Sequence, residues 1–137
     1  MKTLSIILPC YNPPEHWEQF VQEGYEAVQQ HTSLSPSLII VNDGSTKDIQ
    51  EPIYFLQEKI SNFTYINCPV NRGKGAALKV GVSQANTEYI IYTDIDFPYT
   101  NESFLKVFNE LVQQKADIAV GIKDDQYNEF LPRYPKI

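Results

Sequence analysis

The sequence is poor in three features, and each shortage excludes a class of protein. Its 137 residues include two cysteines, Cys10 and Cys68, too few for the disulfide framework of a small secreted domain. Its 11 basic residues are outnumbered by 17 acidic ones, and a net charge of −6 argues against a nucleic-acid partner. The N-terminal apolar run is too short for a signal peptide or a membrane span.

From these shortages we expect a cytoplasmic domain. Any association with the cytoplasmic face of a membrane would come from a C-terminal part that follows this chain. The mass of 15.7 kDa and the apolar content of 42% suit one domain over residues 1–137 with a packed core.

Several catalytic and nucleotide-binding fingerprints are also absent. The sequence contains neither Gly-x-Gly-x-x-Gly nor Gly-x-x-x-x-Gly-Lys-[Ser/Thr], so it is neither a dinucleotide-binding nor a P-loop chain by motif. It lacks Gly-x-Ser-x-Gly, and His16 and His31 are not spaced as metal ligands with another His or Cys. Hydrolase triads and histidine-based metal sites are therefore unsupported.

What the sequence does contain is an alternation of short apolar runs and helical periodicity. It predicts strands at 4–8, 38–41, 64–67, 89–93 and 118–122. It predicts helices at 15–30, from near Pro52 to about 60, at 76–85, and after a cap at Asn101 with Phe104, Val107, Phe108 and Leu111 inward. This order predicts an α/β fold: a mostly parallel, Rossmann-like sheet with helices on both faces.

Polar residues follow four of the predicted strands, at the edge where such sheets bind ligands. Asp94 and Asp96 lie two residues apart, so in extended backbone both carboxylates point the same way. A divalent cation with oxygen ligands would neutralise them and could hold a diphosphate. A solvated acidic turn is the alternative, because Asp-X-Asp alone is common.

Two further segments at this edge have both a functional and a plain interpretation. Asn42 to Ser45 could present a carboxylate to a nucleobase or a ribose, or form an ordinary turn. The loop from Asn71 to Gly75, with Arg72 and Lys74, could bind phosphate at a helix start, or be a solvated loop. Tyr11 could stack on a base.

Together these segments resemble the nucleotide-binding half of a family 2 glycosyltransferase with the GT-A fold. The third of the matching blocks is closest to the dolichyl- and polyprenyl-phosphate mannose or glucose synthases. The blocks occur in the family's order and spacing: Ile6-Ile7-Leu8-Pro9-Cys10-Tyr11-Asn12, Ile39-Ile40-Val41-Asn42-Asp43-Gly44-Ser45, Asn71-Arg72-Gly73-Lys74-Gly75-Ala76-Ala77 and Tyr92-Thr93-Asp94-Ile95-Asp96.

The resemblance implies an inverting glycosyltransferase that uses a UDP- or GDP-sugar donor. It implies Mg²⁺ or Mn²⁺ held by Asp94 and Asp96, a base contact from Asp43, and phosphate-side cations at Arg72 and Lys123. The implied nucleotide-binding residues are Pro9, Tyr11, Asn12, Asp43, Lys74 and Asp94. The implied acceptor is a polyprenyl phosphate or a growing surface glycan.

Three departures from the family pattern bear on function. Asn42 replaces the usual first aspartate of its pair, and Phe97-Pro98-Tyr99 replaces small residues after the metal motif. Family catalytic domains also continue well beyond Ile137, so we expect the acceptor part and the general base to be missing. A non-catalytic nucleotide-sugar-binding module and, below it, a sugar nucleotidyltransferase are the alternative functions.

Overall fold

The computed structural model describes residues 3–32, 34–95, 106 and 109. The chain divides into two compact units, Met1–Asn101 and Glu102–Ile137, and the elements below all belong to the first. In the second, Lys106 and Asn109 are helical and exposed. The predicted stripe beside them and the predicted strand at 118–122 lie outside the described residues.

The described elements alternate strand and helix from the first strand to the last. No helix of the described part is long and apolar enough to cross a membrane. The order is β1 (Leu4–Cys10), α1 (Trp17–Thr32), β2 (Ser37–Asp43), α2 (Gln50–Lys59), β3 (Phe63–Cys68), α3 (Lys74–Gln84) and β4 (Tyr89–Tyr92).

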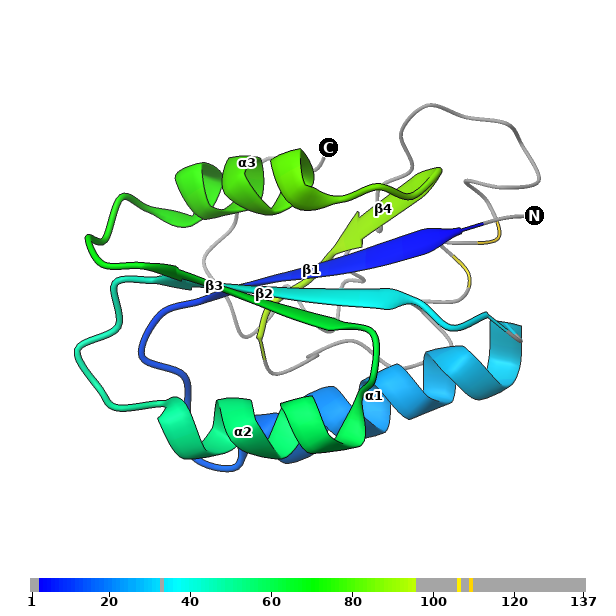
Figure 1. Ribbon diagram of the computed structural model, residues 1–137, viewed down its shortest axis with the longest axis horizontal. Coiled ribbons are helices and arrows are strands. Elements are labelled where there is room, and N and C mark those ends of the chain that lie inside the picture. The colour runs from blue at the N-terminus through cyan, green and yellow to red at the C-terminus, as the bar shows by residue number, and fades with distance from the viewer. Residues whose placement is uncertain (1–2, 33, 96–105, 107–108, 110–137) are drawn as a thin grey trace, which may run out of the picture. The chain divides into compact units, whose positions relative to one another are not determined.

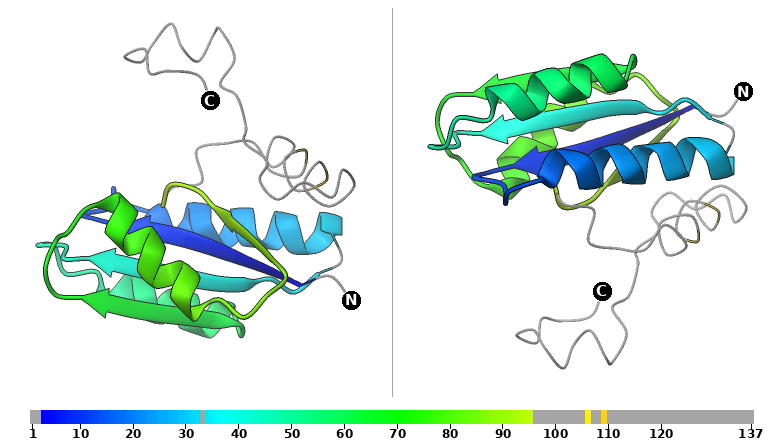
Figure 2. Two further views of the ribbon diagram at one scale, coloured as in Figure 1. Left: turned by 90° about the horizontal axis from the view of Figure 1, so that it is seen from above. Right: turned by 90° about the horizontal axis from the view of Figure 1, so that it is seen from below.

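The four strands form one parallel sheet in the order β3-β2-β1-β4. Helices α1 and α2 cover one face and α3 covers the other (Figures 1 and 2). This confirms the predicted α/β fold with helices on both sides. The chain runs outward from β1 to β3 and then returns to the other side of β1, so the strand order reverses between β1 and β4. In open α/β sheets, ligands bind at this topological switch point.

The core under α3 depends on an unusually close approach of helix and sheet. Ile7, Ile39, Val41 and Ala77 form its buried centre. A Cβ at Gly81 would lie 2.6 Å from Ile7 Cγ2, so only glycine lets α3 sit this close without moving that side chain. The position of α3 in turn fixes the loop that precedes it.

Two predicted boundaries, the end of β2 and the start of α3, are each wrong by two residues. Strand β2 continues through Asn42 and Asp43, because these residues pair with Asn67 and Cys68 of β3 instead of turning. Helix α3 begins at Lys74, two residues earlier than predicted, because Ala77 N–H already donates to the Gly73 carbonyl.

The remaining boundaries differ by small amounts with local causes. β1 includes Pro9, whose missing N–H faces the side where β4 has already ended after pairing with Ile7. α1 begins at Trp17, since His16 has a φ of 65°. In α1, Phe20 is exposed, and the buried Tyr25 donates its hydroxyl to the Pro36 carbonyl. α2 begins at Gln50, which places Pro52 in the first turn.

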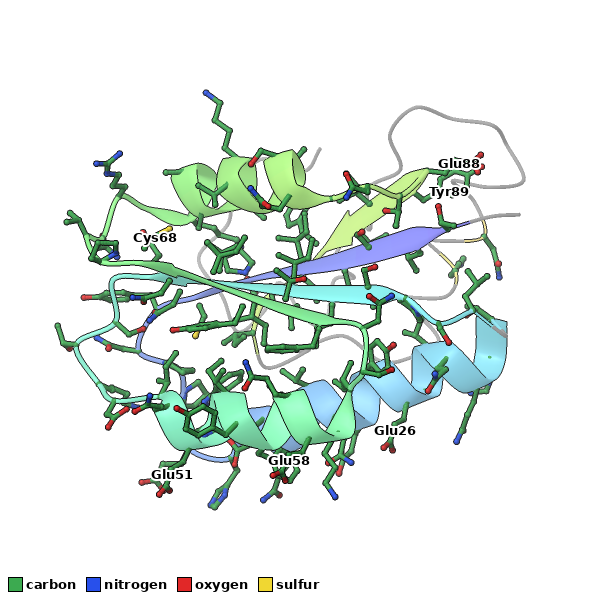
Figure 3. The ribbon with its side chains drawn as sticks, viewed as in Figure 1. Glu26, Glu51, Glu58, Cys68, Glu88 and Tyr89 are labelled. Carbon is green, nitrogen blue, oxygen red and sulfur yellow. The ribbon has the colours of Figure 1, made fainter. Side chains whose placement is uncertain are left out.

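The loops that follow β1, β2 and β3 gather at one edge of the sheet, on the left of Figure 1. Among the described acidic side chains, Glu26, Glu51 and Glu58 point away from the sheet on the outer side of α1 and α2 (Figure 3). Asn12, Asn42 and Asp43 have hydrogen-bond partners at this loop edge.

Candidate functional site

Asn42 and Asp43 are consecutive in β2, so their side chains point to opposite faces of the sheet. Asn42 lies on the α1–α2 side. Its amide nitrogen donates to Tyr65 Oη and Asn67 Oδ1, each at 3.1 Å, and its oxygen accepts from Ser45 N at 3.2 Å. Asn42, the departure from the family pattern, thus has its side-chain groups engaged inside the protein.

Asp43 lies on the α3 side and holds the loop between β3 and α3. Its Oδ1 accepts from Arg72 N at 2.8 Å, and its Oδ2 accepts from Gly73 N at 2.9 Å and from Asn71 Nδ2 at 3.2 Å. Asn71 Nδ2 also donates to the Asp43 carbonyl at 3.0 Å. The residue is 5% exposed. The base contact implied by the resemblance stays a prediction, and the loop contacts were not foreseen.

Gly44 lets the end of β2 touch that same loop. Its φ is +68°, and a Cβ there would lie 2.4 Å from Asn71 N and 2.8 Å from Val70 C. Backbone atoms cannot yield to such an overlap as a flexible side chain can. The Asp43–Gly44 pair and the 70–73 backbone therefore form one tightly joined unit.

Lys74 and Asp94 meet beyond this unit. Lys74 Nζ lies 2.7 Å from Asp94 Oδ1, and the two side chains are 56% and 52% exposed. An ion pair this exposed contributes about 0–1 kcal/mol to stability. Lys74 and Asp94 can consequently separate and bind a ligand instead, with little loss of folding stability.

Asn12 was predicted to bind nucleotide, and the structure shows it holding the β2–α2 loop. Its Oδ1 accepts from Thr46 N at 2.9 Å and Lys47 N at 3.1 Å, and its N–H donates to Ser45 Oγ at 2.9 Å. Its φ is 42°. Asn12 thereby ties the loop after β1 to the loop after β2.

The other predicted residues divide into those at the edge and those outside the described part. Tyr11 is 52% exposed, Pro9 is half-buried, and the Arg72 side chain is exposed. Asp96 and Lys123 lie outside the described residues. The structure thus connects Asp43 to Asp94 through the Asn71–Gly73 loop, which includes Arg72, and through Lys74 at the start of α3.

The two cysteines differ in environment. Cys10 is fully buried, and burial raises the pKa of its thiol to about 12. Cys68 is half-buried, packed against the cluster under α3, and lies between β3 and α3 (Figure 3). It lines a cavity of about 590 Å³ along α3, reached at one end by Asp43 and Arg72. No sequence motif indicated this cavity.

The metal-binding prediction can be tested against Asp94 alone. Its carboxylate already holds one cation, the Lys74 ammonium, and carboxylate oxygens are the ligands that Mg²⁺ and Mn²⁺ prefer. Within the described ranges, no three His, Cys, Asp or Glu side chains lie close enough to hold a metal ion. Asp94 therefore has the chemistry of one metal ligand, and the metal role of Asp94 and Asp96 stays a prediction.

Comparison with known proteins decides the family. The model of the family "Glycosyl transferase family 2" matches residues 5–137. The chain belongs to glycosyl transferase family 2. The resemblance seen in the four sequence blocks is thereby confirmed.

Relatives of this family 2 chain include enzymes with different acceptors. It is 37% identical over 93 residues to the poly-beta-1,6-N-acetyl-D-glucosamine synthase of Staphylococcus epidermidis, covering 68% of this chain and 21% of that protein. It is 28% identical over 126 residues to the dolichyl-phosphate beta-glucosyltransferase ALG5D of Trichomonas vaginalis, covering 86% and 38%. The chain spans less than half the length of these relatives.

Solved structures confirm the GT-A fold of this family 2 chain. S. aureus TarS, solved in complex with UDP-GlcNAc, matches with a TM-score of 0.59 at 24% identity over 83% of this chain and 32% of that one. The mannosyltransferase PcManGT of Pyrobaculum calidifontis, in complex with GDP-Man and Mn²⁺, matches with 0.59 at 20% identity over 79% and 32%.

Proposed function

We propose that this chain is the donor-binding part of an inverting glycosyltransferase that takes a sugar from a UDP- or GDP-sugar. The observation that carries the proposal is the Lys74–Asp94 pair, 2.7 Å apart beside the switch point and joined to Asp43 by the 71–73 loop. It places an anion-binding and a cation-binding group together, as a nucleoside diphosphate and its metal require.

In the proposed reaction no side chain of the protein forms a covalent bond to the sugar. The acceptor oxygen would attack the anomeric carbon as the bond from that carbon to the diphosphate breaks, and the electron pair would leave with the diphosphate. A phosphate acceptor is already ionised, whereas a sugar hydroxyl would pass its proton to a general base. Lys74, and Arg72 if its exposed side chain turns toward the ligand, would bind diphosphate oxygens. A Mg²⁺ or Mn²⁺ ion held by Asp94 and Asp96 would stabilise the charge that develops on the leaving group.

Pro9 and Tyr11 would form the wall against the nucleoside. Tyr11 is half-exposed at the end of β1, where its ring is accessible to a base. UDP-GlcNAc in TarS and GDP-Man in PcManGT support a nucleotide sugar as the ligand. The acceptor would be a polyprenyl phosphate or a growing glycan, by analogy with the dolichyl-phosphate and poly-N-acetylglucosamine relatives.

We place the reaction in the cytoplasm or at the cytoplasmic face of a membrane. Cell fractionation of the full-length protein, followed by protease protection of intact membrane vesicles, tests this location. Protection of the protein in vesicles whose cytoplasmic face is outward would contradict it.

Calorimetry with UDP, GDP, UDP-GlcNAc and GDP-mannose, each with MnCl₂ or with EDTA, tests the function. We expect binding that depends on the metal and is weakened in Asp94→Asn, while Asp48→Asn serves as the charge-matched control. Equal affinity in EDTA would exclude the metal role, and absence of binding by all four nucleotides would overturn the proposal. Acceptor-dependent release of nucleoside diphosphate is measured on the full-length protein, because we expect the acceptor part and the general base to lie outside this chain; donor binding without such release there would favour the binding-module alternative.

A further inference from the structure

The Asp43 carboxylate is compensated almost entirely by one loop. A carboxylate that is 5% exposed needs hydrogen-bond donors in place of water. The donors that the structure gives it are the N–H groups of Arg72 and Gly73 and the side-chain amide of Asn71. Two of the three come from consecutive backbone positions, so the carboxylate fixes the path of the loop rather than the place of one side chain.

The path of this loop determines the position of Lys74. Gly73 has a φ of +100° and a carbonyl that accepts the first helical hydrogen bond, from Ala77 N at 3.1 Å. Lys74 is the next residue and the first of α3, and its ammonium reaches Asp94. A loop that moved away from Asp43 would therefore move Lys74 relative to Asp94, two groups proposed to serve the diphosphate.

We propose that Asp43 is a positioning residue, whose carboxylate holds the Asn71–Gly73 loop so that Lys74 lies beside Asp94. The consequence for donor binding rests on the proposed function. A residue that reads the base changes the preference among bases when it is replaced. A residue that positions the phosphate side lowers the affinity for all donors alike.

Hydrogen exchange tests the loop contacts without any nucleotide. In Asp43→Asn the amide oxygen can still accept, but the charge-assisted bonds are lost, and the new NH₂ faces the Arg72 N–H if it replaces Oδ1 or the Gly73 and Asn71 donors if it replaces Oδ2. We expect exchange of the Arg72 and Gly73 amide protons, followed by NMR, to accelerate about tenfold or more. Amide protons of β1 should be unchanged. Unchanged exchange at Arg72 and Gly73 would overturn the proposal.

Nucleotide affinity then separates positioning from base reading. We expect Asp43→Asn to weaken UDP and CDP binding by a similar factor, about tenfold, with the UDP-to-CDP affinity ratio kept within about twofold. Asn71→Ala, which leaves the carboxylate in place, should weaken both in the same direction by a smaller factor. A UDP-to-CDP affinity ratio that falls in Asp43→Asn by more than about twofold, with Asn71→Ala like the unmodified chain, would show base reading and overturn the proposal.

Control variants make the hydrogen-exchange experiment and the nucleotide-affinity experiment independent of each other. Asp48→Asn removes a carboxylate whose Oδ1 accepts from Gln50 N at the start of α2, and it should leave exchange at residues 72 and 73 and nucleotide affinity unchanged. If Asp43→Asn fails to fold, the same measurements on Asn71→Ala decide the proposal. If the chain binds none of the nucleotides, the proposed function fails, while the exchange experiment still decides whether Asp43 holds the loop.

Discussion

Asn42 and Asp43 stand side by side at the end of β2, and each holds a different loop with a different chemistry. On the α1–α2 side, a neutral amide joins Ser45, Tyr65 and Asn67. On the α3 side, a carboxylate holds a loop that leads to an exposed ion pair. Neutral, enclosed bonds chiefly stabilise the fold, whereas exposed charges can be redirected to a ligand. Under the proposed function, the α1–α2 face of β2 therefore serves the fold and the α3 face serves the ligand.

The largest effect on stability is expected at Gly44, which directly follows Asn42 and Asp43 at the end of β2. Gly44→Ala places a Cβ 2.4 Å from backbone and imposes a φ of +68° on alanine. We expect the free energy of unfolding to fall by about 2–4 kcal/mol in a urea titration.

Gly75→Ala is the matched control for that change. A Cβ at Gly75 meets nothing within 4 Å, and the residue lies in α3. Alanine should therefore be neutral or stabilise by about 0.5–1 kcal/mol. Equal losses in both variants would show that the contact at Gly44 does not determine stability.

Asn42→Ala should affect stability more than nucleotide binding. It leaves Ser45 N–H, Tyr65 Oη and Asn67 Oδ1 without this partner in a partly buried region. We expect a loss of about 1–3 kcal/mol in unfolding free energy, with the UDP affinity of the folded protein unchanged. A large drop in affinity at full folding would erase the proposed division between the two faces.

Lys74→Gln should change stability little, and it should change the affinities for Mn²⁺ and for UDP in opposite directions. Removing a cation 2.7 Å from Asp94 should raise Mn²⁺ affinity in the absence of nucleotide several-fold and lower UDP affinity in its presence. Unfolding free energy should change by less than about 1 kcal/mol. Manganese titrations by electron paramagnetic resonance measure the first effect, and calorimetry measures the second.

Lys79→Gln is the charge-matched control, since Lys79 is exposed on the same helix and lines the cavity beside Cys68. It should leave Mn²⁺ affinity nearly unchanged. If it raised Mn²⁺ affinity as much as Lys74→Gln, the effect would come from overall charge and not from the contact with Asp94.

The last comparison concerns the two thiols, one on each face of the sheet. A disulfide reagent such as DTNB should modify Cys68 at least about tenfold faster than Cys10 at pH 8, because Cys10 is buried and its pKa is about 12. The folded state keeps the Cys10 proton above pH 9, where the unfolded chain loses it, so this group lowers stability as pH rises from about 9 toward 12. Equal labelling rates would contradict the burial of Cys10.

The sequence by itself determined the order of elements, the parallel sheet and the family, because apolar runs and helical periodicity record which faces are buried. It also predicted that Asp43, Lys74 and Asp94 lie at one edge of the sheet, because polar residues that follow buried strands of a parallel sheet meet there. It could not say that Asn12 and Asp43 bind loops, since their partners are 33 to 35 and 28 to 30 residues away.

The tertiary structure alone decided those partners. Pairing with Asn67 and Cys68 kept Asn42 and Asp43 in β2, and the alternation of an extended strand then sent their side chains to opposite faces. The close approach allowed by Gly44 brought the 70–73 backbone within reach of the Asp43 carboxylate. Local patterns do not encode such contacts, because they arise only when separate elements pack together.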